Sequence, residues 1–133
     1  MEIADALQDL IDREVGWIRT ELEAGEIEFA LRLVPDLLTH VRALLGDAPV
    51  PALEPPATTG DSRFDTLVIA GIRWAMNSDA DRPWSAPEPL PTPWYPYDFR
   101  SVTEAWLVLS KRETPAELAR AGIIFREGGL LST

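Results

Sequence analysis

The chain has 133 residues, of which 46% are hydrophobic and 26% charged, a length and composition that suit one globular domain with a modest core. Acids outnumber bases 22 to 12, and the net charge of −10 makes nucleic acid a poor default partner because it repels phosphate backbones. Cysteine is absent and His40 is the single histidine, which excludes disulfides, thiol nucleophiles, Cys-ligated zinc and multi-histidine metal sites.

The first 46 residues predict an acidic helical hairpin. Apolar residues recur at helical spacing from residue 3 to 22, and Gly25 is placed to end this helix. A second helix begins near Glu26 and buries Ile27, and Pro35 ends or kinks it, because proline lacks the backbone donor. The pattern then resumes as far as Gly46. Residues 1–28 hold nine acids and two arginines, a net charge of −7.

The middle of the chain predicts a linker and a third helix. Residues 47–62 carry four prolines and few large apolar side chains, which is typical of a linker. Ser62 and Asp65 form a capping-box pattern, and the apolar stripe that follows predicts a helix that ends near Met76–Asn77.

The C-terminal part, residues 63–133, contains a proline- and aromatic-rich stretch. Six prolines fall within residues 83–97, which forbids a helix and predicts an extended segment packed on the protein. Ser101 and Glu104 offer a second capping box, and Thr114-Pro115-Ala116-Glu117 predicts a short helix with Thr114 as its cap and Pro115 as its first residue. Residues 123–125 are prone to form an edge strand.

These elements predict a mostly α fold in one domain spanning residues 1–133. We expect four to five helices, the extended segment 83–97, and at most a short strand pair. The domain divides into the hairpin 1–46, the linker 47–62 and the helical part 63–133.

Catalytic and metal-binding patterns are weak in this chain. Asp36, four residues before His40, is the local group that could orient this histidine as a base. Asn77, Asp79 and Asp81 alternate as in a calcium loop, but Arg82 stands where that loop needs glycine. We therefore expect no catalytic residues, no metal and no cofactor.

Two features point to a protein partner instead. The acids Glu21, Glu23 and Glu28 could attract a basic cleft, although a charged face can equally be a solvated one. The aromatic residues Trp84, Trp94 and Tyr95 could anchor a partner, or could wrap the protein's own helices.

Three blocks, in this order, carry a family resemblance: Leu22–Arg32, Pro55–Asp65 and Thr114–Ile124, with Trp94-Tyr95-Pro96 between the second and the third. Together they resemble a family of small actinobacterial antitoxin-like proteins. The resemblance implies a toxin enzyme as partner, of the nucleotidyltransferase-like kind, and it brings no catalytic residues.

The sequence therefore predicts a cytoplasmic, non-enzymatic protein that neutralises a toxin enzyme by occlusion. The acidic N-terminus does not resemble a secretory signal, and no apolar run reaches the length of a membrane span. The alternatives are a DNA-binding transcriptional regulator, a small carboxylate-dependent enzyme and a structural assembly protein.

Overall fold

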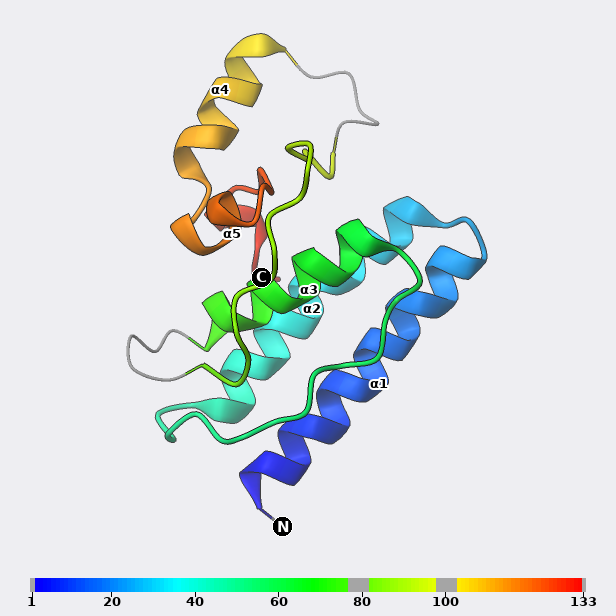
Figure 1. The fold of residues 1–133 in the computed structure, drawn as a ribbon, viewed down its shortest axis with the longest axis vertical. Helices are drawn as coiled ribbons and strands as arrows, with labels where there is room; N and C mark the ends of the chain where they lie inside the picture. Colours follow the sequence, from blue (N-terminus) through cyan, green and yellow to red (C-terminus); the bar gives the residue numbers. More distant parts are fainter. Residues whose placement is uncertain (1, 77–81, 98–102, 133) are drawn as a thin grey trace.

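Helices α1 (Ile3–Glu23) and α2 (Ile27–Leu45) form an antiparallel hairpin, which runs along one side of the molecule in Figure 1. The structure is a computed structural model that describes residues 2–76, 82–97 and 103–132. Gly25 allows the sharp connection between the two helices, because its φ of 78° lies in the left-handed region. Helix α2 continues through Pro35, so this proline does not end the helix.

Three further helices complete the described fold. They are α3 (Ser62–Ala75), α4 (Glu104–Glu113) and α5 (Ala116–Arg120), followed by a 3₁₀ turn, η1 (Glu127–Gly129). Within the described residues, strand structure is limited to one parallel bridge between Trp94 and Ile123. The predicted mostly α fold with four to five helices is confirmed.

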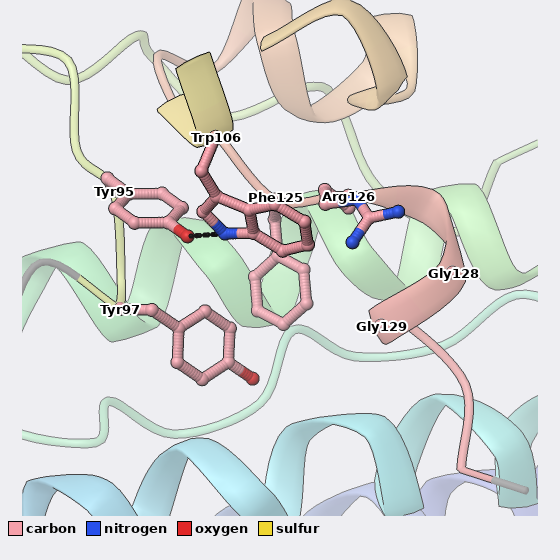
Figure 2. A pocket seen from close by; sticks show the side chains of 7 residues that line it. All are labelled: Tyr95, Tyr97, Trp106, Phe125, Arg126, Gly128 and Gly129. Carbon is pink, nitrogen blue, oxygen red and sulfur yellow. Dashed lines mark hydrogen bonds between the residues drawn. The ribbon is translucent and has the colours of Figure 1, made fainter. Parts of the chain in front are cut away.

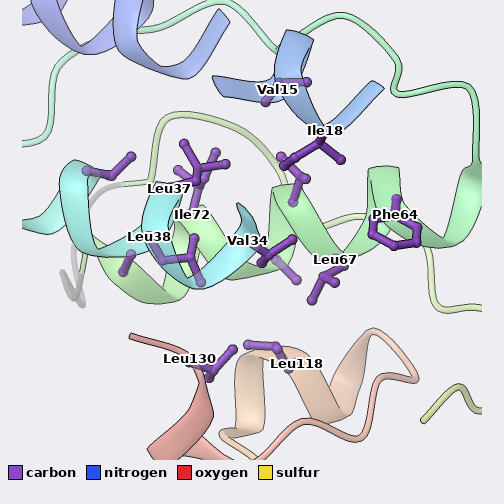
Figure 3. Close-up of a cluster of buried hydrophobic side chains, with 14 of the residues drawn as sticks. Val15, Ile18, Val34, Leu37, Leu38, Phe64, Leu67, Ile72, Leu118 and Leu130 are labelled. Atoms are coloured by element: carbon purple, nitrogen blue, oxygen red, sulfur yellow. The ribbon is translucent and has the colours of Figure 1, made fainter. Parts of the chain in front are cut away.

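The core lies where α1, α2 and α3 meet the C-terminal residues (Figure 3). The hairpin contributes side chains such as Ile18 and Leu38, and α3 contributes Phe64, all without exposed surface. Gly71 lets α3 approach α2 closely, since a Cβ there would lie 3.1 Å from a methyl carbon of Leu38. One expectation fails: Ile27 is 46% exposed, because α2 begins at this residue, beyond the last turn of α1.

The predicted linker, residues 47–62, runs alongside α1 and is hydrogen-bonded to it. Gln8 donates to the Glu54 carbonyl at 3.1 Å and accepts from the Glu54 N–H at 2.7 Å. Farther along, Arg19 donates to the Thr58 carbonyl at 3.3 Å. The extended chain thus crosses the surface of α1 before it enters α3.

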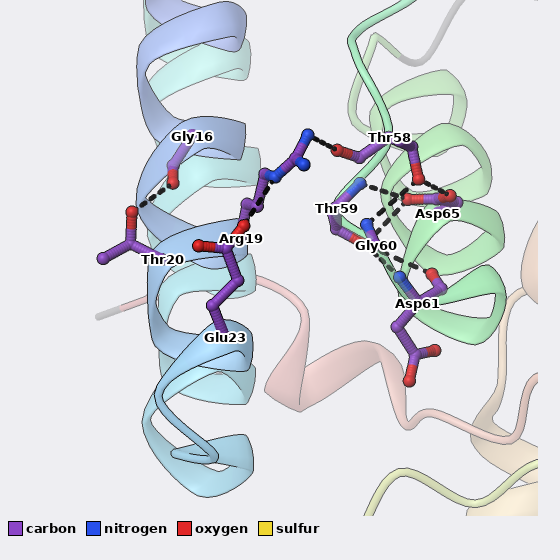
Figure 4. A network of polar contacts seen from close by, with 9 residues as sticks. All are labelled: Gly16, Arg19, Thr20, Glu23, Thr58, Thr59, Gly60, Asp61 and Asp65. Atoms are coloured by element: carbon purple, nitrogen blue, oxygen red, sulfur yellow. Dashed lines mark hydrogen bonds and ion pairs between the residues drawn. The ribbon is translucent and has the colours of Figure 1, made fainter.

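The start of α3 differs from the predicted capping box. The cap is Asp61, whose side chain accepts from the N–H groups of Arg63 and Phe64, and Ser62 is already the first helical residue. Asp65 does not reach back to Ser62. It accepts instead from Thr58 and Thr59, as Figure 4 shows.

Residues 82–97, which we call the strap, pack along α3 and α5. Backbone hydrogen bonds link Leu90 and Trp94 to the carbonyls of Ala121 and Gly122, at 2.9 and 2.8 Å. Arg73 of α3 pairs with Glu117 of α5 and also donates to the Trp84 carbonyl. The strap therefore covers the protein's own helices.

The last two helices begin differently from the predictions. Thr103 caps α4 by accepting from the Trp106 N–H at 3.1 Å, whereas Ser101 lies outside the described residues. Pro115 is the N-cap of α5 rather than its first residue. Thr114 does not cap α5, because its hydroxyl donates to the Ser110 carbonyl and accepts from the Phe125 N–H.

Two absences hold for the described part of the chain. None of its helices combines the length and the apolar character needed to cross a bilayer. No cluster of three or more histidine, aspartate or glutamate side chains is arranged to hold a metal ion there. The Asn77–Asp81 stretch with calcium-loop spacing lies outside the described residues.

Candidate protein-binding surface

The hairpin connection brings the three predicted acids together. Glu21 and Glu23 occupy the last turn of α1, and Glu28 occupies the first turn of α2. Glu23 pairs with Arg19 at 2.8 Å, and Glu28 lies 3.6 Å from Arg32. Both are exposed i, i+4 pairs, which contribute little to stability. The carboxylates are therefore accessible to a partner at the end of the hairpin.

An open groove of about 350 Å³ lies beside one of these acids, Glu21. Its walls come from both helices of the hairpin: Trp17, Thr20, Glu21, Phe29 and Leu33. We call it the hairpin groove.

Two aromatic side chains dominate this groove. Trp17 and Phe29 are each 50% exposed. The Arg13 guanidinium lies over the Trp17 ring, 5.6 Å from its centre. Exposed aromatic surface gathered in a concave, charged region is typical of a protein-binding site.

Trp17 and Phe29 were not among the residues predicted from the sequence to contact a partner. A signal for Trp17 was present, because this residue falls outside the apolar stripe of its helix, next to the buried Ile18. A large aromatic residue off the buried stripe of an amphipathic helix has to face solvent or a partner.

The structure places the predicted aromatic anchors elsewhere. Trp94 is 6% exposed, with its ring centre 5.4 Å from that of Phe64, and the Arg63 guanidinium lies over its face. Trp84 is partly buried and donates its indole N–H to the Leu53 carbonyl at 3.1 Å. These contacts support the alternative in which the strap wraps the protein's own helices.

Tyr95 belongs to a third environment. Its hydroxyl accepts from the Trp106 indole N–H at 3.0 Å, and its ring lines a cavity beside α4 (Figure 2). The six predicted residues thus divide into an acidic group on the hairpin, two tryptophans in the packed strap, and one tyrosine in a separate cavity.

His40 has a partner that local spacing did not predict. Its Nδ1 lies 2.9 Å from both carboxylate oxygens of Glu14, on the facing helix, rather than bonding to Asp36. Glu14 is 3% exposed, so His40 caps an otherwise buried carboxylate. This pairing joins α1 to α2, and neither residue lines the two cavities described above.

The Pro55–Asp65 block, which carries part of the family resemblance, has a structural role here. The Asp65 carboxylate accepts from the Thr58 hydroxyl at 2.5 Å and from the Thr59 N–H and hydroxyl, both at 2.7 Å (Figure 4). The network anchors the end of the linker to α3.

Fold and site together describe a small α-helical protein whose hairpin carries an open groove lined by two aromatic rings and Glu21. The chain matches no protein-family model, no curated protein and no solved structure.

Proposed function

We propose that this protein is a non-enzymatic, antitoxin-like binding protein that neutralises a cognate toxin enzyme by occluding its basic active-site cleft. The observation that carries this proposal is the hairpin groove, where Trp17 and Phe29 are each half exposed beside Glu21. The acids attract the basic rim of the cleft, and the two aromatic rings fill its apolar centre.

The chemistry of the hairpin groove supports a macromolecular partner. Exposed tryptophan and other aromatic side chains at the centre of a contact are the commonest source of binding energy. The surrounding acids determine the speed of association and the choice of partner more than the affinity itself. Both contributions are concentrated at one end of the hairpin.

The experiment first looks for a gene next to this one that encodes an enzyme with a basic cleft. Its product, the neighbouring enzyme, is co-expressed and purified with the full chain. Trp17→Ala and Phe29→Ala should each weaken binding by about 2–4 kcal/mol, the range of interface hot spots. The melting temperature of the free variants should change little, because each side chain is half exposed in the free protein.

Leu44→Ala is the matched control, since Leu44 is an exposed apolar residue near the other end of α2. It should leave affinity unchanged. The proposal is wrong if the neighbouring enzyme does not bind, or if Trp17→Ala and Phe29→Ala bind and inhibit it as well as the unmodified chain does.

A further inference from the structure

A second cavity lies between the strap, α4 and the C-terminal residues, and it shares no lining residue with the hairpin groove. It encloses about 340 Å³, within the range of small-molecule sites. Figure 2 shows its lining residues: Tyr95, Tyr97, Trp106, Phe125, Arg126, Gly128 and Gly129. We call it the aromatic cavity.

Aromatic rings from three separate segments form its walls. The Tyr97 ring centre lies 5.3 Å from that of Phe125 and 6.2 Å from that of Tyr95, both in edge-on arrangements. Trp106 remains 40% exposed although it lies beside these rings. Phe125 is only 1% exposed and supports the others from below, so the rings open to a ligand are Tyr95, Tyr97 and Trp106. Such walls favour a flat apolar ligand, because an exposed ring offers a face or an edge for stacking.

Arg126 is the one charged side chain among these lining residues. Its Nε donates to Glu113 at 2.5 Å, and its guanidinium carbon lies 4.5 Å from the centre of the Trp106 ring. These two contacts orient the guanidinium, whose side chain is 34% exposed. Within the described residues, no hydrogen bond engages its terminal nitrogens, so they can donate to a ligand.

The polar groups at the cavity determine the sign of the ligand's charge. A guanidinium with free terminal N–H groups matches the geometry of a carboxylate. The Tyr95 hydroxyl accepts from Trp106, which leaves its own hydrogen to donate. A cationic ligand is disfavoured, because Arg126 already lies over the Trp106 face that would attract it.

We infer that the aromatic cavity binds a small planar aromatic carboxylate. The ring lies against Tyr97, and the carboxylate accepts from the terminal nitrogens of Arg126.

Three probes with one ring system test this inference on the unmodified full chain. The probes are indole-3-acetate, indole-3-acetamide and tryptamine, which differ chiefly in charge. Their binding is measured by titration calorimetry and by shifts of the protein's tryptophan indole N–H signals in NMR spectra. Indole-3-acetate should bind about ten-fold more tightly than the amide, the difference expected for one charge-assisted hydrogen bond, and tryptamine should bind most weakly.

A pair of variants locates the site. Arg126→Gln should remove the preference for the acid over the amide, whereas Arg112→Gln, the same charge change on an exposed residue of α4, should preserve it. Circular dichroism establishes that both variants fold. If Arg126→Gln does not fold, Tyr95→Phe replaces it, and its loss of one donor should reduce the preference about three-fold.

Three results would overturn the inference. In the first, none of the probes binds at millimolar concentration. In the second, tryptamine or the neutral amide binds as tightly as indole-3-acetate. In the third, the preference survives in Arg126→Gln, or is as large in Tyr95→Phe as in the unmodified chain where that variant replaces it, so that the carboxylate is recognised elsewhere.

Discussion

The carboxylate of Asp65 joins the end of the linker to the start of α3. It accepts three hydrogen bonds from Thr58 and Thr59, and Thr59 is only 1% exposed. Asp65→Ala leaves the buried Thr59 N–H and hydroxyl without this acceptor, so we expect a loss of about 2–3 kcal/mol in the free energy of unfolding. Urea denaturation measures it.

Asp61→Ala is the comparison for this variant. Asp61 is the N-cap of the same helix, and the loss of a cap costs about 1 kcal/mol. Asp65→Ala should therefore be the more destabilising of the two. Equal or reversed effects would show that the Thr58–Thr59 network contributes no more than an ordinary cap.

Gly16 is a position where a substitution should stabilise the protein, because it lies inside α1 with open space around it. A Cβ at this position would meet no atom within 4 Å, and the backbone is helical. Gly16→Ala should raise the free energy of unfolding by about 0.5–1 kcal/mol, since alanine loses less backbone entropy on folding. A lower melting temperature in a thermal scan would contradict this expectation.

At the scale of elements, the apolar periodicity was enough to predict α1, α2 and α3, because each helix buries one stripe of side chains. The exact first residues were less predictable. Asp61 and Ser62 both have side chains that can cap α3, and Asp61 is the one that does. Thr114 could cap α5, but its hydroxyl bonds to Ser110 and Phe125 instead. The partner of His40 could not be predicted from local spacing either. Glu14 precedes His40 by 26 residues and contacts it only because α1 and α2 pack against each other.

The strap lacks the periodic spacing of apolar residues from which burial can be predicted. The sequence therefore left two alternatives, in which the strap wraps the protein's own helices or contacts a partner. Trp94 is 6% exposed and lies against Phe64. We expect Trp94→Ala to lower the free energy of unfolding by about 3–5 kcal/mol, the cost of removing a large core side chain. Urea denaturation of the free protein tests this value.

Trp17→Ala is the matched control for Trp94→Ala, because it removes the same side chain from a half-exposed position. It should change stability far less. If the two variants were equally stable, Trp94 would not belong to the core, and a role as a partner anchor would regain support.

At the scale of the whole molecule, charge is distributed unevenly. The first 28 residues carry −7 of the total −10. This asymmetry was visible in the sequence, although five of the nine acids lie between Glu2 and Glu14 and not at the end of the hairpin. The hairpin groove was not visible in the sequence. Its walls come from two helices, and the way these helices pack determines which residues of each helix line it.

The role of this charge is tested by neutralising the three acids of the hairpin end. The triple variant Glu21→Gln, Glu23→Gln, Glu28→Gln should associate with the neighbouring enzyme about ten-fold more slowly at low salt, with a weaker dependence of the rate on salt concentration. Its melting temperature should stay nearly constant, because the two ion pairs that it removes are exposed. Stopped-flow fluorescence measures the association rate.

The control for this variant is a second triple variant, Glu88→Gln, Glu104→Gln, Glu127→Gln. It makes the same change in net charge at exposed positions outside the hairpin. Long-range attraction depends on where charge lies relative to the partner's cleft, so the control should slow association much less. Equal slowing in both triple variants would mean that only the net charge matters. No slowing in either would mean that the acids are a solvated face, and the proposed occlusion of a basic cleft would then be wrong.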